Sequence, residues 1–326
     1  MRALILPSLS IEERPTPVPQ DGQILVRVHA AGLNRADLSQ RAGKYPAPAG
    51  WPEDIPGLEY AGEIVEVGRG VTYWSLGDRV MGLVGGGAQA EYVVVHQAEA
   101  MAVPDSMTYV EAAAIPEAFL TAWDAMVRQA RVRGGERVLV HAIGSGVGTA
   151  AAQLADVLGV TVIGTSRTPD KLERAGALGM EHGVLTPPSK EAGQATDNDW
   201  VSQVGDPVNV IIDTLGAEYF DANLSLLAPG GRLVVLGMLT GAVAGRIDLG
   251  RVLRQRLTIV GTAMRVRTAP ERAELVERFV GDILPHLNTG QLRAVVETSV
   301  PWSEAAQAYE LLGSNATFGK VVLRVE

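Results

Sequence analysis

Cysteine is absent from all 326 residues of the chain. Its absence excludes disulfide bonds, thiolate nucleophiles, iron–sulfur clusters and every zinc site that is built on cysteine. The five histidines stand far apart in the sequence, without the close spacing of a metal site, so we expect them to be packed rather than catalytic. They are His29, His96, His141, His182 and His286.

Clusters of basic residues and long apolar runs are also missing. The chain carries 28 basic and 37 acidic side chains, a net charge of −9, which argues against nucleic acid or an anionic membrane surface as the main partner. The most apolar stretch, Val138–Ala155, contains a histidine, a glutamine and several glycines, a mixture that a membrane-spanning helix avoids. Because the apolar run before Pro7 is too short for the core of a signal peptide, we expect a cytoplasmic protein.

An apolar content of 47% leaves ample material for folded cores, and the length predicts about two domains. The texture of the sequence changes near residue 115. Before that point, short strand-like runs are separated by Gly, Pro and Asp, which predicts an antiparallel barrel or sandwich. The predicted strands are Ala3–Leu6, Ile24–Ala30, Glu59–Val67, Arg79–Val84 and Ala90–Val95.

From Glu117 onward, strands and helices alternate. The strands are continuous apolar runs, which is typical of a parallel sheet that helices bury on both faces. We predict strands at Val138–His141, Thr161–Thr165, Val208–Asp213, Leu233–Leu236 and Leu257–Gly261, and helices at Gly148–Leu158 and Pro169–Leu178. The polar segment Thr186–Asn198 is interpreted as a surface connection. The tail, from about Met264, is predicted to hold an amphipathic helix around Ala273–Leu287 and a final strand, Lys320–Val325.

A glycine-rich turn follows the first of these apolar strands. Small residues let a backbone approach a pyrophosphate closely, and the N–H groups and the dipole at the start of the following helix favour an anion. The residues expected to line such a site are Ala142, Gly144, Ser145, Gly146, Val147 and Gly148. The spacing departs from the full G-x-G-x-x-G pattern, so an ordinary tight turn is the alternative. A strand before the turn and a helix after it favour a dinucleotide site.

The second apolar strand ends without the acidic residue that would bind the ribose hydroxyls of NAD. Ser166, Arg167 and Thr168 stand there instead, with Lys171 one turn further, and these groups can hold the 2′-phosphate of NADPH. The alternative is a helix start with solvated basic side chains. We expect NADPH as the cofactor.

Several motifs occur in an order and spacing that resemble a known family. They are Ala31–Asp37, Gly57–Glu59, Gly77–Val80, Ala112–Thr121, His141–Gly148 and Gly319–Leu323. Nearly end to end, the chain resembles the zinc-free quinone oxidoreductase branch of the medium-chain dehydrogenase/reductase superfamily. This branch comprises the zeta-crystallin-like enzymes, and the chain is most similar to their tumour-suppressor-inducible group.

The resemblance implies an α/β fold with two domains. A chaperonin-10-like β-barrel catalytic domain would comprise residues 1–116 and be completed by residues 264–326. A Rossmann domain with a doubly wound parallel sheet would comprise residues 117–263. Members of the family are usually homodimers, so the last Rossmann strand, around Leu257–Thr262, is expected to pair across a two-fold axis, which would protect its apolar edge.

The resemblance also implies an enzyme that works without zinc. The catalytic metal positions of the related alcohol dehydrogenases correspond here to Asn34, Leu58 and Glu117, and Leu58 offers no ligand atom. The retained carboxylate of Glu59 cannot form a site alone, and the cysteine-rich lobe of the structural zinc has no counterpart. Without a metal to polarise an alcohol, dehydrogenation of simple alcohols is not expected, whereas a quinone is already electrophilic.

The same resemblance places Asn34, Tyr45 and Thr121 beside the nicotinamide and the substrate carbonyl. Each residue has an alternative role. Asn34 can cap the helix that begins at Arg35, Tyr45 can be an aromatic ring packed in its turn, and Thr121 can bond to the backbone of its own helix. The sequence leaves these alternatives open.

Further cofactor contacts are implied by the resemblance. Gly237 and Met238 follow the fifth Rossmann strand, and Met264 follows the last one, which would bring them near the nicotinamide. Lys320 stands where relatives place a basic residue on the pyrophosphate. Thr186 stands where the family often has a tyrosine near the 2′-phosphate, so the sequence lacks this one contact.

Three functions are compatible with these observations. The first is the transfer of reducing equivalents from NADPH to quinones, in one-electron or two-electron steps. The second is the reduction of activated double bonds in enals or enones with the same hydride donor. The third is a non-catalytic NADPH-binding protein of the crystallin or RNA-binding kind. The acidic charge argues against RNA, and the presence of all three site residues argues against lost catalysis.

Overall fold

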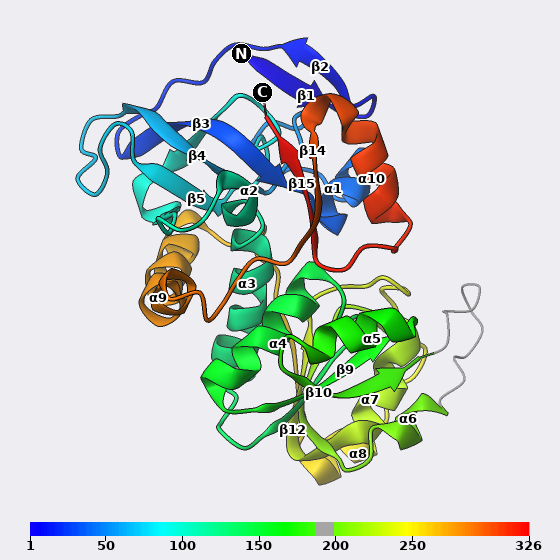
Figure 1. Ribbon diagram of the computed structural model, residues 1–326. Helices are drawn as coiled ribbons and strands as arrows, with labels where there is room; N and C mark the ends of the chain where they lie inside the picture. Colours follow the sequence, from blue (N-terminus) through cyan, green and yellow to red (C-terminus); the bar gives the residue numbers. More distant parts are fainter. Residues whose placement is uncertain (187–198, 326) are drawn as a thin grey trace. The chain divides into compact units, whose positions relative to one another are not determined.

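The computed structural model describes residues 1–186 and 199–325, and the chain divides into two compact units (Figure 1). The first unit comprises Met1–Leu120 and Met264–Glu326, and the second comprises Thr121–Ala263. The boundary between Leu120 and Thr121 falls inside helix α3 (Pro116–Trp123), four residues after the expected one before Glu117. Apart from Thr186, the polar segment interpreted as a surface connection lies outside the described residues.

A largely antiparallel sheet forms the centre of the first unit. Its strand order is β14-β15-β3-β4-β5-β7, and β6 also pairs with β3. The strands are β3 (Gln23–Gly32), β4 (Glu59–Val67), β5 (Arg79–Leu83), β6 (Tyr92–His96), β7 (Ala100–Ala102), β14 (Val296–Pro301) and β15 (Lys320–Arg324), while β1 (Arg2–Ile5) and β2 (Ser10–Glu13) form a separate antiparallel pair. Because β3 pairs with β4, β6 and β15, it brings the ends of distant chain segments together.

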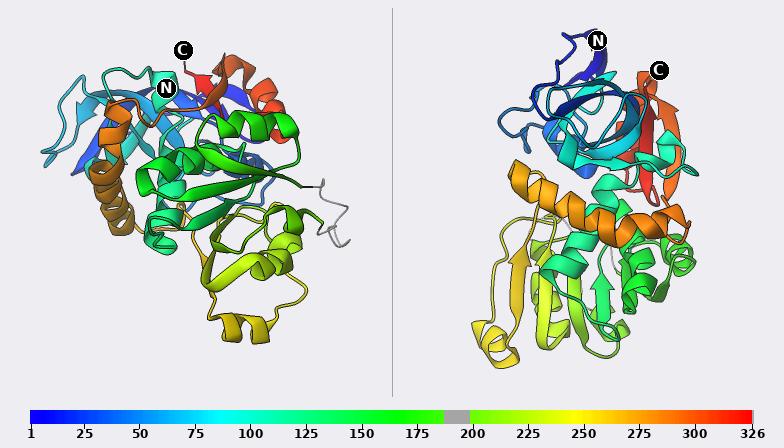
Figure 2. Two further views of the ribbon diagram at one scale, coloured as in Figure 1. Left: turned by 60° about the horizontal axis from the view of Figure 1, so that its bottom comes forward. Right: turned by 90° about the vertical axis from the view of Figure 1, so that its left-hand side faces the viewer.

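Helices pack against this sheet. They are α1 (Arg35–Arg41), α2 (Tyr109–Ala112), α9 (Ala269–Asn288) and α10 (Ala305–Gly313), with single 3₁₀ turns at Gln97–Glu99 and Trp302–Glu304. Helix α3 (Pro116–Trp123) begins in this unit and ends in the second. Figure 2 shows α9 as a long orange helix. It buries an apolar stripe that includes Leu275, Phe279 and Ile283, as the predicted amphipathic pattern requires.

A six-stranded parallel sheet forms the centre of the second unit, in the order β10-β9-β8-β11-β12-β13. The strands are β8 (Arg137–Val140), β9 (Thr161–Ser166), β10 (Met180–Leu185), β11 (Val208–Asp213), β12 (Leu227–Val235) and β13 (Thr258–Gly261). The chain begins in the middle, moves outward to β10, and then crosses to β11, which is the doubly wound order of a dinucleotide-binding fold. The predicted α/β class is confirmed.

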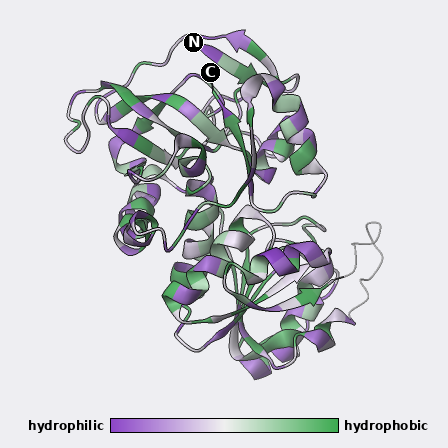
Figure 3. Ribbon diagram, in the orientation of Figure 1, coloured by the Kyte–Doolittle hydropathy of each residue, from purple (hydrophilic) through white to green (hydrophobic). Residues whose placement is uncertain are grey.

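Helices bury both faces of the parallel sheet. They are α4 (Gly146–Leu158), α5 (Pro169–Gly176), α6 (Trp200–Gln203), α7 (Phe220–Leu226) and α8 (Leu249–Gln255), with a π-helical segment at Asp124–Gln129 and a 3₁₀ turn at Ala217–Tyr219. The strands are largely green in Figure 3, the colour of hydrophobic residues. Leu139, Ile163, Ile211 and Leu233 on these strands are fully buried. Within residues 1–186 and 199–325, no helix is long and apolar enough to cross a bilayer.

Candidate active site

Three strand ends of the first unit meet at a buried ion pair. Glu59 begins β4, Lys320 begins β15, and Gly32, which is paired with Glu59, ends β3. The Nζ atom of Lys320 lies 2.5 Å from Oε1 of Glu59, and the two side chains are 5% and 0% exposed. A Cβ atom on Gly32 would lie 2.3 Å from that Oε1 atom and 2.5 Å from the carbonyl oxygen of Ala113. The ion pair therefore requires glycine at position 32.

Hydrogen bonds within the same unit complete this ion pair. The Lys320 ammonium donates to the carbonyl oxygen of Leu33 at 2.8 Å and to Oδ1 of Asn34 at 2.5 Å. The Glu59 carboxylate accepts Nδ2 of Asn34 at 2.9 Å and the backbone N–H of Glu117 at 2.8 Å. A buried ion pair is tolerated when its remaining donors and lone pairs are satisfied. All three ammonium protons have an acceptor, so Lys320 has no donor left for a ligand.

Asn34 joins the ion pair to the start of α1. It occupies the N-cap position, and its backbone N–H donates to Oδ2 of Asp37 at 2.8 Å, which is one half of a capping box. Both ends of its side-chain amide are engaged, by Lys320 and by Glu59. The structure therefore supports the capping alternative, and a contact between Asn34 and the nicotinamide stays a prediction.

Two further carboxyl groups lie near the ion pair. Asp37 is fully buried and accepts the N–H groups of Asn34 and Gly57, at 2.8 and 3.1 Å. Burial raises the pKa of Asp37 to about 6, although these N–H groups and the Lys320 charge act in the opposite direction. Burial, followed by the negative charge of Glu59, raises the pKa of Glu117 to about 7. Carboxyl groups that titrate near neutral pH are typical of active sites.

Arg265 fixes the loop that carries Tyr45. Its guanidinium donates to the carbonyl oxygens of Tyr45 and Gly85, at 2.9 and 2.8 Å, and to Oε1 of Gln40 at 2.7 Å. It also lies 4.8 Å from the centre of the Tyr45 ring, which is a cation–π contact. The Tyr45 ring is therefore packed, which agrees with the alternative role stated for it. No described residue forms a hydrogen bond with the Tyr45 hydroxyl. Sequence reasoning did not find Arg265, because nothing near it in the sequence reveals its distant partners.

Thr121 lies on α3, one turn after Glu117. Its Oγ1 atom is buried and has no hydrogen-bond partner in the described part of the chain. A threonine inside a helix often returns this bond to the preceding turn, and that alternative for Thr121 is wrong. An unpaired buried hydroxyl costs roughly 1–3 kcal/mol, so it is better placed to meet a ligand than to stabilise the fold.

In the second unit, the glycine-rich turn leads from β8 into α4. Ala142 adopts a left-handed backbone conformation with φ of 50°, and Ser145 caps the helix by accepting the N–H of Gly148 at 3.0 Å. A Cβ atom on Gly148 would lie 2.5 Å from a carbonyl oxygen of the turn, so the position needs glycine. Helix α4 begins with Gly146 and Val147, whose N–H groups have no carbonyl of the same helix to bond. The turn has the geometry of an anion site.

The residues expected at the 2′-phosphate lie around this turn. Ser166 ends β9, and its hydroxyl accepts the N–H of Thr168 at 3.1 Å. The stem of Lys171 packs over the turn, since a Cβ atom on Gly144 would lie 2.8 Å from its Cδ atom. Arg167 is exposed at the end of the strand. The structure therefore brings Lys171 to the glycine-rich turn and places Ser166 and Arg167 at the neighbouring strand end.

A tyrosine that the sequence analysis did not single out lies beside these residues. The hydroxyl of Tyr219 forms a hydrogen bond with the side chain of Thr186, which follows β10. Burial raises the pKa of Tyr219, while this bond and the nearby charge of Arg167 lower it. Tyr219 ends the 3₁₀ segment Ala217–Tyr219, which brings its ring to Thr186.

His141 fastens the strand ends that carry the glycine-rich turn. Its ring nitrogens lie 3.0 Å from Oγ1 of Thr165 and 2.7 Å from Oδ1 of Asn223. Asn223 in turn donates to Oδ2 of Asp213 at 3.2 Å, so the ends of β8, β9 and β11 are linked. Burial lowers the pKa of His141, which keeps the ring neutral. His141 is therefore packed in the interior, as expected.

The other predicted cofactor residues belong to both units. Gly237 follows β12, and its N–H lies 3.3 Å from the carbonyl oxygen of Asp213, while Met238 is 62% exposed. Met264 is buried in the first unit. Lys320 already gives its ammonium protons to Glu59, Leu33 and Asn34, so the predicted contact with a pyrophosphate would require one of these bonds to be given up.

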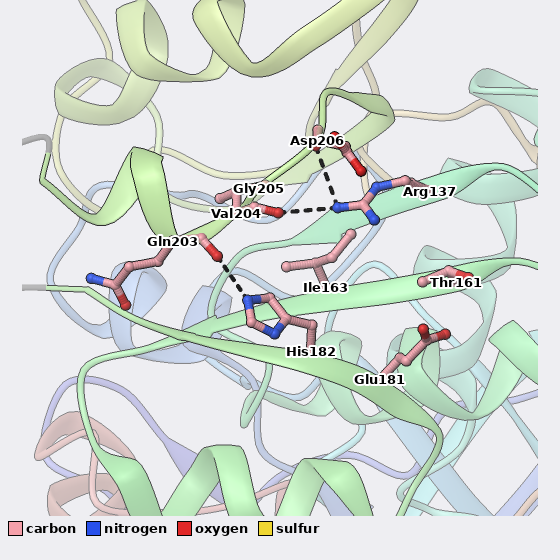
Figure 4. Close-up of a pocket in the computed structure, with 9 residues that line it drawn as sticks. All are labelled: Arg137, Thr161, Ile163, Glu181, His182, Gln203, Val204, Gly205 and Asp206. Carbon is pink, nitrogen blue, oxygen red and sulfur yellow. Dashed lines mark hydrogen bonds between the residues drawn. The ribbon is translucent and has the colours of Figure 1, made fainter.

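A cavity of about 370 Å³ opens at the amino ends of the parallel strands, opposite to the ends that lead into the glycine-rich turn (Figure 4). It lies at the amino ends of β8, β9 and β10, where Arg137 donates to the carbonyl oxygen of Val204 at 3.0 Å and His182 lies 2.7 Å from the carbonyl oxygen of Gln203. The glycine-rich turn leaves the carboxyl ends of the strands. The cavity is therefore not part of the nucleotide site.

Family models match both units. A model of the alcohol dehydrogenase GroES-like domain matches residues 20–105, and a model of zinc-binding dehydrogenases matches residues 146–280. A quinone oxidoreductase from Rattus norvegicus is 31% identical over 310 residues, which are 94% of this chain and 90% of that protein. Polyketide synthase GfsB from Streptomyces halstedii is 34% identical over 307 residues, and the chain spans 5% of the length of that relative.

Solved structures share the whole fold. The quinone oxidoreductase from Thermus thermophilus, whose structures include a complex with NADPH, is 32% identical with a TM-score of 0.81 over 99% of this chain and 100% of that one. The enoyl reductase of CurK is 25% identical with a TM-score of 0.84 over 100% of this chain and 99% of that one.

The zinc that one family description implies does not fit these residues. In the described part of the chain, no group of three or more His, Asp or Glu side chains is placed to hold a metal ion. Leu58 is a buried apolar residue at one of the corresponding ligand positions. At the second position, the Asn34 amide is already engaged by Lys320 and Glu59.

Proposed function

Because the chain belongs to the quinone oxidoreductase branch of the medium-chain dehydrogenase/reductase superfamily, we propose that it transfers reducing equivalents from NADPH to quinones without a metal ion. Bound NADPH would supply the hydride. The chain would supply binding, orientation and hydrogen bonds to the oxygen that gains charge. The proposed acceptor is a small quinone or a similar electrophile.

One observation carries this proposal: the ion pair of Lys320 and Glu59 engages Asn34 and the backbone of Glu117, two of the positions that correspond to metal ligands in the related alcohol dehydrogenases. Its donors and acceptors are saturated by Leu33, Asn34 and Glu117, so it offers no Lewis acid and no free donor. A substrate for such a site has to be electrophilic by itself. Quinones meet this requirement because reduction makes them aromatic.

The proposed cofactor is NADPH rather than NADH. β9 ends at Ser166 instead of an acidic residue, and Arg167 and Lys171 lie around the glycine-rich turn. Positive side chains at this place favour a 2′-phosphate, whereas a carboxylate would repel it. Tyr219, bonded to Thr186, adds a further hydroxyl close to Arg167.

Tyr45 and Thr121 are the proposed donors to the substrate oxygen. Both have a hydroxyl that no described residue engages, whereas the amide of Asn34 is engaged at both ends. We therefore assign Asn34 mainly to the orientation of the ion pair. Gly237, Met238 and Met264 are proposed as neighbours of the nicotinamide.

Reduction of activated double bonds is the second candidate function. The similarity to the enoyl reductase of CurK, at 25% identity, supports it. An enone, like a quinone, is electrophilic without a metal, but the carbon beside its carbonyl has to receive a proton. A chain that serves this reaction needs a proton donor as well as hydrogen-bond donors.

We also propose a homodimer through β13. This strand is at the edge of the parallel sheet, paired with β12 on one side, and Ile259 is 40% exposed on it. Leu249 and Leu253 on the preceding helix α8 are 72% and 78% exposed. An apolar edge strand of this kind is usually covered by a second chain.

The test is the oxidation of NADPH in the presence of a panel of quinones and a panel of enones of matched size. We expect turnover with quinones at a higher kcat/KM than with enones. A preference for enones would establish the second candidate. Saturable NADPH binding without oxidation by either panel would contradict both.

A further inference from the structure

Three carboxyl groups lie around Lys320, those of Glu59, Asp37 and Glu117. Of these, the Glu117 carboxyl is the one that forms no hydrogen bond with a described residue. Its backbone N–H donates to Glu59, but no described residue donates to its side-chain oxygens. It stands in the first turn of α3, one turn before the unpaired hydroxyl of Thr121, so both side chains lie on one face of that helix. Glu117 is partly exposed, while Glu59 and Asp37 are fully buried.

The charges around Glu117 do not balance when every group is ionised. The groups that act on it are the carboxyls of Glu59 and Asp37 and the cations of Lys320 and Arg265. Together with Glu117 itself, these are three carboxyls and two cations in a largely buried cluster. One bound proton removes the excess negative charge, which is costly to keep away from water.

Hydrogen bonds decide which carboxyl keeps this proton. Glu59 accepts from Lys320, from the Asn34 amide and from a backbone N–H, and Asp37 accepts two backbone N–H groups. Such donors stabilise the ionised form of both residues. Glu117 has none of them, and its pKa is raised to about 7. The proton therefore rests on Glu117.

We propose that the Glu117 carboxyl is the acid that protonates the substrate after hydride transfer. The inference rests on the proposed function and adds the source of its proton. A hydride from NADPH and a proton from Glu117 together reduce one C=C or quinone unit, leaving NADP⁺ and the Glu117 carboxylate. Because Glu117 is partly exposed, water can return the proton before the next turnover.

The other groups of the cluster are less suited to this role. The three ammonium protons of Lys320 are held by Glu59, Leu33 and Asn34, so the release of one of these protons to the substrate would break the ion pair. Burial raises the pKa of Tyr45, which makes its hydroxyl a weaker acid although it can still donate a hydrogen bond. Asp37 has no exposed surface.

The test compares Glu117→Gln with the wild type on an enone and on a quinone, across pH 5 to 9. Wild-type kcat on the enone should fall as pH rises through about 7, because the acid form of Glu117 is lost. In Glu117→Gln this dependence should vanish and kcat should drop roughly 10²-fold, the usual contribution of a general acid. The quinone rate should drop less, since water readily protonates an oxygen anion.

Two controls accompany this comparison. Glu277→Gln removes an exposed carboxyl of α9 and should behave as the wild type. Glu117→Asp keeps a carboxyl group at this position, so its kcat on the enone should still fall as pH rises. Infrared difference spectra of the wild type should show a protonated carboxylic acid that disappears near pH 7 and is missing in Glu117→Gln, and NADPH dissociation constants should be equal in all variants.

An active Glu117→Gln enzyme with the wild-type rate and pH profile would overturn the inference and leave the proposed function intact. So would an infrared band with its midpoint near pH 7 that persists in this variant; a band of Asp37, whose pKa is about 6, is expected in both proteins. A wild-type protein that oxidises NADPH with neither acceptor would instead contradict the proposed function, and the inference with it.

Discussion

Lys320 and Glu59 form a 2.5 Å ion pair although the two residues are separated by most of the chain. β15 brings the lysine to the end of β3, and β4 brings the glutamate to the same place. The result is a fixed positive charge held among oxygen acceptors at the joined ends of three strands. The pair therefore has both a structural and a functional consequence.

The structural consequence is that the free energy of unfolding depends strongly on both Lys320 and Glu59. Lys320→Met leaves the Glu59 carboxylate buried without its cation, and we expect a loss of about 3–5 kcal/mol in the free energy of unfolding. Removing both charges, as in Lys320→Met combined with Glu59→Leu, should recover much of this loss. Urea denaturation followed by circular dichroism measures both.

The matched control is Arg27→Gln, which breaks the surface pair of Arg27 with Glu63 at 3.1 Å. Exposed pairs contribute about 0–1 kcal/mol, so this variant should unfold close to the wild type. Equal losses in Lys320→Met and Arg27→Gln would show that the buried pair carries no special weight.

Arg167 should determine the choice between the two nicotinamide cofactors. Arg167→Ala is expected to raise the dissociation constant of NADPH roughly tenfold or more, since a charge-assisted hydrogen bond is worth about 1.5–3 kcal/mol, while that of NADH should hardly change. Fluorescence titration gives both constants. Arg174→Ala, in the last turn of α5, is the control for a general loss of positive charge. Equal constants for the two cofactors in the wild type would contradict the assignment.

The hydroxyls of Tyr45 and Thr121 should act on turnover rather than on cofactor binding. We expect Tyr45→Phe and Thr121→Val to lower kcat/KM with 1,4-benzoquinone by roughly tenfold, less than the 10²–10³-fold typical of acyl transfer, because a quinone oxygen accepts charge readily. A less electrophilic enone should lose more. If neither variant loses activity on either acceptor, stacking and proximity alone account for catalysis.

The exposed edge of β13 should decide the oligomeric state. Ile259→Lys places a charge in the middle of this strand and is expected to convert a dimer into a monomer. Sedimentation velocity at micromolar concentration measures the change. Val18→Lys, at an exposed apolar residue of the first unit, is the control and should leave the dimer intact. A wild-type monomer, or a dimer that survives Ile259→Lys, would contradict the proposed interface.

The sequence predicted those elements whose pattern is local. β11 (Val208–Asp213) matches its predicted bounds, and α4 begins two residues earlier than predicted and ends at the predicted Leu158. β10 was missed because Met180–Leu185 contains Glu, His and Gly, and an edge strand does not need a continuous apolar run. β14 was missed for the same reason.

The site could be predicted in outline, because short motifs mark the glycine-rich turn and the end of β9. Its ion pair could not be predicted. Nothing around Lys320 reveals that β15 will carry it to Glu59, and nothing around Arg265 reveals its contacts with Gln40 and Tyr45. Contacts between residues so far apart in the chain depend on strand register, which local patterns do not contain.

The central claim, reduction without a metal, is tested most directly by measuring zinc and activity in the same preparation. Protein purified under metal-controlled conditions should contain no stoichiometric zinc by elemental analysis, and its NADPH-dependent reduction of 1,4-benzoquinone should be unchanged after treatment with a chelator. About one zinc ion per chain, together with activity that is lost on chelation and restored by zinc, would contradict the account.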